Sequence, residues 1–111
     1  SISCISKLNN HLFAGRNQNN IEVFSLKGKI KITTLKGHTD FVTSIQRLTN
    51  KIFVSASKDL TLRVWNIDQY GSAYVVNVFA CNDVWNLCLL NDLVLICSNE
   101  KGRISAYSLK D

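Results

Sequence analysis

Three segments of this 111-residue chain repeat one another at an interval that restricts the folds available to it. The stretches LFAGRNQNNIEVF, FVSASKDLTLRVW and LICSNEKGRISAY align without gaps and end at Phe24, Trp65 and Tyr107. These aromatic residues are separated by 41 positions (24 to 65) and 42 positions (65 to 107). An interval of about 40–45 residues is typical of four-stranded units that stack side by side. The repeat therefore predicts a chain of successive small sheets.

Each repeat divides into short strands that are separated by polar turns, and no stretch has a sustained helical period. Strands are expected at 29–35, 41–48, 52–57, 60–67, 74–79, 84–90, 93–98 and 103–109. The stretch 93–97 is apolar at consecutive positions, whereas a strand with one solvent-exposed face alternates apolar and polar residues. We therefore expect sheets that are covered on both faces.

Composition agrees with a folded domain and excludes several other classes of protein. Hydrophobic residues make up 46% of the chain and charged residues 19%, which argues against a disordered tail. No apolar run approaches the roughly 18 residues that a membrane span needs. The four cysteines, Cys4, Cys81, Cys88 and Cys97, form no Cys-x-x-Cys pair, so no metal site is predicted. We expect them to be reduced in a cytoplasmic or nuclear protein, although the sequence leaves disulfide pairing open.

The net charge of +5 reflects one cluster of bases, Lys27, Lys29, Lys31 and Lys36, with no acid between them. Such a cluster can attract nucleic acid, anionic lipid or an acidic partner. It can also protect an outer strand against edge-to-edge aggregation. We favour edge protection, because no aromatic residue alternates with the lysines to stack on bases.

The middle segment resembles a known repeat. LKGHTDFVTSIQ, followed by FVSASKDLTLRVWNI, is similar to a complete WD repeat, with Gly37-His38, Ser55, Asp59 and Trp65-Asn66 at that family's motif positions. Asn66 stands in place of the usual aspartate. The resemblance implies an all-β fold, part of a WD-repeat β-propeller. It would form one domain of about three four-stranded antiparallel blades, at 1–35, 41–80 and 84–109, the last lacking its outer strand.

In the WD-repeat family four side chains form a buried hydrogen-bond network, which here would comprise His38, Ser55, Asp59 and Trp65. The outer repeats depart from this pattern. Gln18 and Phe24 replace the aspartate and tryptophan of the first repeat, and Ala80, Lys101 and Tyr107 replace the histidine, aspartate and tryptophan of the third. Although His38, Ser55 and Asp59 are the residue types of a catalytic triad, we expect no catalytic residue, cofactor or metal, because no motif indicates an exposed nucleophile beside an oxyanion site.

Propellers close with about 4–8 blades, so just under three cannot close a ring. We therefore expect further blades from sequence beyond this chain, or self-association. The chain is interpreted as a C-terminal fragment or an internal cut of a longer propeller.

The resemblance implies a scaffold that presents loops to other proteins or peptides. The candidate contact residues, placed where the family's loops fall, are Thr39, Asp40, Phe41, Lys58, Asn82, Asp83, Trp85 and Glu100. Two alternatives remain: an RNA-processing propeller that binds nucleic acid through the basic stretch 27–36, and the substrate-recognition part of a larger enzyme such as a ubiquitin ligase. Membrane insertion is not expected.

Overall fold

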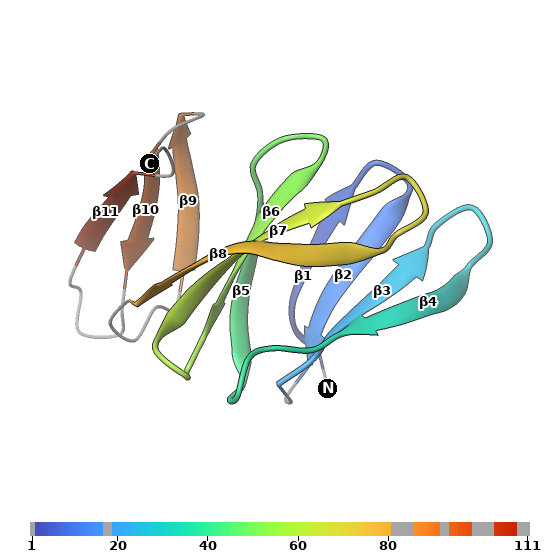
Figure 1. Ribbon diagram of the computed structural model, residues 1–111, viewed down its shortest axis with the longest axis horizontal. Helices are drawn as coiled ribbons and strands as arrows, with labels where there is room; N and C mark the ends of the chain where they lie inside the picture. Colours follow the sequence, from blue (N-terminus) through green and yellow to red (C-terminus); the bar gives the residue numbers. More distant parts are fainter. Residues whose placement is uncertain (1, 17–18, 81–85, 92–93, 99–103, 109–111) are drawn as a thin grey trace.

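A computed structural model describes the chain except for residues 1, 17–18, 81–85, 92–93, 99–103 and 109–111, and its side chains at 4–15 and 19–80. The fold is all-β and consists of antiparallel sheets placed side by side (Figure 1). The first sheet contains β1 (Ile2–Leu8), β2 (His11–Arg16), β3 (Ile21–Ser25) and β4 (Ile30–Leu35), in that order. No helix long and apolar enough to cross a bilayer occurs in the described part of the chain.

The other two sheets repeat this arrangement. The second contains β5 (Val42–Arg47), β6 (Ile52–Ser57), β7 (Thr61–Ile67) and β8 (Ala73–Ala80), in chain order. The third has the order β11 (Ile104–Ser108), β10 (Val94–Ser98), β9 (Asn86–Asn91). The predicted all-β fold of four-stranded antiparallel sheets is therefore confirmed.

The strand predictions are correct to within a few residues, with one instructive error. The predicted strand 52–57 coincides with β6. Leu60, predicted to begin a strand, instead lies in the β6–β7 turn with a left-handed φ of 68°. Its N–H donates to the carbonyl of Ser57 at 3.2 Å, so the chain needs one more residue to reverse direction before β7 begins.

A continuous hydrophobic core joins the first sheet to the second. Its large side chains include Leu8, Phe13 and Ile21 from the first sheet and Phe53 and Trp65 from the second. The ring centroids of Phe13 and Phe53 are 4.4 Å apart, and those of Phe53 and Trp65 are 6.0 Å apart with nearly parallel planes. Burying each such side chain stabilises the fold by about 1.5–3 kcal/mol, so contact between sheets is a main source of stability.

The inner strands β6 and β7 of the second sheet are buried on both of their faces. Phe53 and Trp65 belong to the core against the first sheet, whereas Val54 and Leu62 belong to a second cluster on the opposite face. On that side β9 of the third sheet runs beside β5 (Figure 1). A sheet between two others buries consecutive residues, as Phe53 to Ser57 of β6 do, which is the packing that stacked propeller sheets require.

Candidate functional site

A chain of hydrogen bonds crosses the second sheet from the β4–β5 linker to β7. The indole N–H of Trp65 donates to Ser55 Oγ at 2.8 Å. Ser55 Oγ lies 2.6 Å from Nε2 of His38, and Nδ1 of His38 lies 2.8 Å from Oδ2 of Asp59. Trp65, Ser55 and His38 are buried and Asp59 is nearly so, so these groups depend on one another for partners.

The protonation states give this chain of hydrogen bonds a direction. Burial lowers the pKa of His38 below its ordinary value of 6.5, more strongly than the hydrogen bond to Asp59 raises it. Burial also opposes ionisation of Asp59, but hydrogen bonds from Thr61, His38 and the Thr39 backbone outweigh it and hold the pKa of Asp59 below 3.8. At neutral pH a neutral imidazole therefore donates from Nδ1 to an ionised Asp59, and its Nε2 accepts the hydroxyl proton of Ser55.

Asp59 also organises the turn around it, through partners that sequence reasoning missed. Its Oδ2 accepts the N–H of Thr39 at 3.0 Å, and its Oδ1 accepts the N–H of Thr61 at 2.9 Å and the hydroxyl of Thr61. The N–H of Asp59 donates to Ser57 Oγ at 3.0 Å. The spacing Ser57-x-Asp59-x-Thr61 could have predicted these contacts from the sequence, because Ser and Asp side chains cap nearby backbone N–H groups in turns.

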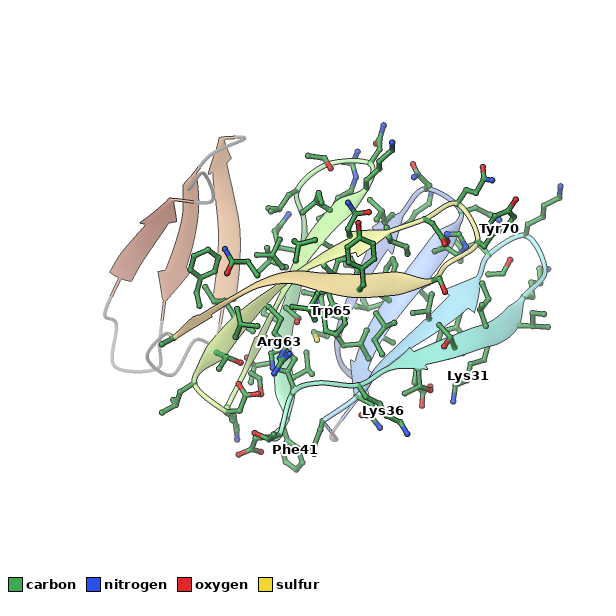
Figure 2. All side chains as sticks on the ribbon, in the orientation of Figure 1. Lys31, Lys36, Phe41, Arg63, Trp65 and Tyr70 are labelled. Atoms are coloured by element: carbon green, nitrogen blue, oxygen red, sulfur yellow. The ribbon has the colours of Figure 1, made fainter. Side chains whose placement is uncertain are left out.

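Arg63 is a second residue that the sequence did not single out. It lies on β7 near His38, where its positive charge helps to lower the pKa of that imidazole. Its guanidinium packs against the linker so closely that a Cβ at Gly37 would lie 2.9 Å from Nη1 (Figure 2). Glycine at position 37 therefore makes room for this arginine, and its φ of 156° is one that a side chain would strain.

The His38, Ser55 and Asp59 side chains are connected like a catalytic triad, but their surroundings prevent nucleophilic chemistry. Ser55 has no exposed surface, so no substrate can reach its hydroxyl. Its oxygen already accepts the Trp65 N–H. Moreover, no cluster of three potential metal ligands exists among the described residues. What the arrangement can do is hold the linker and the β6–β7 turn in fixed positions.

The loop surface, defined as Thr39, Asp40, Phe41 and Lys58, adjoins this network through Thr39 and is exposed. Lys58 Nζ is 5.7 Å from the centroid of the Phe41 ring, and the Lys58 N–H donates to the Phe41 carbonyl at 2.9 Å. The hydroxyl of Ser57 donates to the Asp40 carbonyl at 3.0 Å. Figure 2 shows Phe41 projecting from the end of the linker. The structure therefore brings these four predicted contact residues together on two adjacent segments.

The other four predicted contact residues, Asn82, Asp83, Trp85 and Glu100, lie outside the described residues, as do Gln18 and Lys101. Their placement remains a prediction.

Comparison with known proteins identifies the repeat. The family "WD domain, G-beta repeat" matches residues 29–66, the segment that contains His38, Ser55, Asp59 and Trp65. Residues 29–66 are therefore a WD40 repeat. Over 68 residues, 60% of its length, the chain is 34% identical to pre-mRNA-processing factor 19 of Bos taurus. Those residues correspond to 14% of that relative.

Solved structures show the same fold over nearly the whole chain. The structure of U3-55K matches 99% of it with a TM-score of 0.81 and 22% identity. The β-propeller domain of Myceliophteria thermophila Cps50 (Swd1) matches 99% with a TM-score of 0.82 and 14% identity. The chain spans 34% and 36% of these two structures, so the three sheets correspond to part of a WD40 β-propeller.

The first two sheets differ from each other at the positions of the network. In the gapless alignment of the repeats, Ala14 stands where the second sheet has Ser55, and Phe24 where it has Trp65. The first sheet therefore lacks both the hydroxyl and the indole N–H that would bond to it. Donor and acceptor are absent together, so no unsatisfied partner is left by this pair of replacements.

Proposed function

We propose that this chain is part of a non-catalytic protein-interaction scaffold and that the loop surface contacts a partner protein or peptide. WD40 domains generally act as interaction scaffolds. The observation that carries the proposal is that an exposed aromatic residue, Phe41, is held in place by hydrogen bonds from Ser57 and Lys58 to the backbone around it. Phe41 is 41% exposed, and the backbone on both sides of it is fixed through Asp40 and Lys58.

A preorganised surface of this kind favours binding, because little conformational entropy is lost when a partner docks. Phe41 supplies apolar area, and the Lys58 ammonium over its ring adds charge at the same position. Aromatic residues are frequent anchors of protein interfaces. Asn82, Asp83, Trp85 and Glu100 are proposed to extend this surface over the third sheet.

The test compares the proteins that co-purify with the wild-type chain and with a Phe41→Ser/Lys58→Glu double variant, by quantitative mass spectrometry from the same cells. We expect specific partners to be depleted with the double variant. A matched Tyr74→Ser/Lys7→Glu variant also removes one exposed aromatic and one exposed lysine, away from the loop surface, and should retain those partners. Equal recovery with all three proteins would contradict the proposal.

Nucleic-acid association is the second candidate function. Lys27, Lys29, Lys31 and Lys36 are all exposed on or beside β4, and one relative is a pre-mRNA-processing factor. For this candidate, affinity for single-stranded RNA should fall steeply with salt concentration. In a plot of log K against log salt concentration, Lys→Ala substitutions should reduce the slope by about 0.7 for each phosphate that a lysine no longer neutralises. Salt-independent binding, or none, would remove this candidate.

Two further proposals follow from the WD40 fold. Additional blades are needed to close the ring, because these sheets account for about a third of the matched structures. The cytoplasm or the nucleus is the proposed location, with nuclear residence favoured by the name of the pre-mRNA-processing relative.

A further inference from the structure

The opposite end of the sheets from the loop surface carries a second exposed apolar surface. Three large hydrophobic side chains gather there: Ile30 and Ile32 from β4 of the first sheet, and Tyr70 from the β7–β8 turn of the second. They are 62%, 40% and 73% exposed, respectively. We call these three residues the hairpin-end patch.

Contacts between the two sheets place the turn that carries Tyr70 against the first sheet, next to Ile32. A Cβ at Gly71 would lie 3.1 Å from Cδ1 of Ile32 and 3.0 Å from Nε2 of His11, so the β7–β8 turn sits directly on the first sheet. Ile30 pairs with Ser25, and Ser25 pairs with His11. Ile30 therefore lies on the same face of the first sheet as His11, the residue that the β7–β8 turn contacts. Figure 2 shows Tyr70 at this turn, beside the tip of the β3–β4 hairpin.

The turn that presents Tyr70 is held rigidly. Asp68 Oδ1 accepts the N–H of Tyr70 at 2.8 Å and the N–H of Ser72 at 3.1 Å. The Asp68 N–H donates to the Ser72 carbonyl at 2.9 Å, and the Gly71 N–H donates to the Asp68 carbonyl at 3.2 Å. The most exposed aromatic side chain among the described residues therefore projects from an ordered support, as an interface anchor does.

Bases lie in two turns near the patch. Lys27 and Lys29 are exposed in the β3–β4 turn, and Lys29 is held in a left-handed conformation with φ of 56°. Lys51 is exposed in the β5–β6 turn, and its carbonyl accepts the N–H of Ile67 at 2.8 Å, just before the turn that carries Tyr70. Asp68 is the acid nearest to Tyr70 along the chain, and its Oδ1 is already engaged by backbone donors.

We infer that the hairpin-end patch binds a protein segment whose apolar side chains are flanked by Asp or Glu residues. An apolar centre with an aromatic anchor and a charged rim is the pattern of a protein interface. The lysines make acidic residues complementary to that rim. A nucleic-acid strand fits less well, because two of the three apolar side chains are aliphatic and offer no ring on which a base can stack. This site is separate from the loop surface and does not depend on it.

The test uses the full chain as bait for a displayed library of random peptides, with a Tyr70→Ala/Ile30→Ser variant screened in parallel. We expect the peptides enriched only on the wild-type chain to combine apolar residues with Asp or Glu. For a synthesised peptide of this kind, Tyr70→Ala should weaken binding by about tenfold or more. Lys27→Glu/Lys29→Glu should also weaken it, whereas the same peptide with Lys in place of its acids should not bind the wild type.

Tyr74→Ala is the matched control, because Tyr74 is 62% exposed but alternates with the core-facing Ala73 and Val75 and so lies on the other face of β8. It should bind the peptide like the wild type, and circular dichroism should show that every variant is folded. Enrichment that is equal on the wild type and the double variant, or no enrichment, would overturn the inference. Patch-dependent binding of oligouridylate or phosphatidylserine vesicles, without binding of acidic peptides, would overturn it as well.

Discussion

Replacing Ser55 by alanine tests the energetic role of the buried network. The substitution removes one hydroxyl from a site with no exposed surface, and it leaves two groups without partners. One is the indole N–H of Trp65, which is 3% exposed, and the other is Nε2 of His38, which is 4% exposed. At about 1–3 kcal/mol for each unsatisfied buried group, Ser55→Ala should lower the free energy of unfolding by about 2–6 kcal/mol.

A double-mutant cycle separates the hydrogen bond from simple loss of packing. Trp65→Phe removes the indole N–H, so in the Ser55→Ala background it eliminates one of the two unsatisfied groups. The double variant should therefore be less destabilised than the sum of the single variants by about 1–3 kcal/mol. The first sheet already carries this combination, Ala14 with Phe24, at the equivalent positions.

The assay is urea denaturation of the full chain and each variant, followed by circular dichroism in a single buffer at one temperature. Ser72→Ala is the control, because Ser72 is exposed, and its stability should stay within about 0.5 kcal/mol of the wild type. Additivity of Ser55→Ala and Trp65→Phe within about 0.5 kcal/mol would refute the reasoning, since it would mean that the two side chains do not depend on each other.

Two further perturbations test the pH response and the contact between sheets. Folding lowers the pKa values of His38 from 6.5 and of Asp59 from 3.8, so the unfolded chain binds protons more readily and the free energy of unfolding should fall as the pH drops through 6.5 and again below 3.8. Urea midpoints measured across this range should show the upper step in the wild type, and an equal step in His38→Asn would contradict the assignment. Gly15→Ala should destabilise the chain by about 1–3 kcal/mol, because its Cβ would lie 2.5 Å from Cys4 Sγ. Gly28→Ala, whose Cβ meets nothing closer than 3.5 Å, is its control, and equal thermal midpoints for the two variants would argue against close packing at Gly15.

The parts of the fold that were predictable depend on local patterns. The repeat interval and the polar turns were enough to locate β6 and, within a few residues, the other predicted strands. The four network residues were predicted from the resemblance to WD repeats, and they lie in hydrogen-bond contact. Thr61 was missed although its contact with Asp59 is local, whereas Arg63 was missed because its role depends on the position of Gly37 in space.

Sequence alone indicated, to within a few residues, which segments form strands and where the chain turns, because strand and turn preferences operate between near neighbours. No aromatic residue stands among the lysines in the sequence, yet the fold brings Tyr70 to the same end of the first sheet as Lys27 and Lys29. Gly71, next to Tyr70, contacts Ile32, although the two lie in different repeats. Only the tertiary structure decided that the Tyr70 turn lies against Ile32, because this contact depends on how closely the first and second sheets stack. The distance between the two sheets is set by the side chains that both sheets contribute to the core.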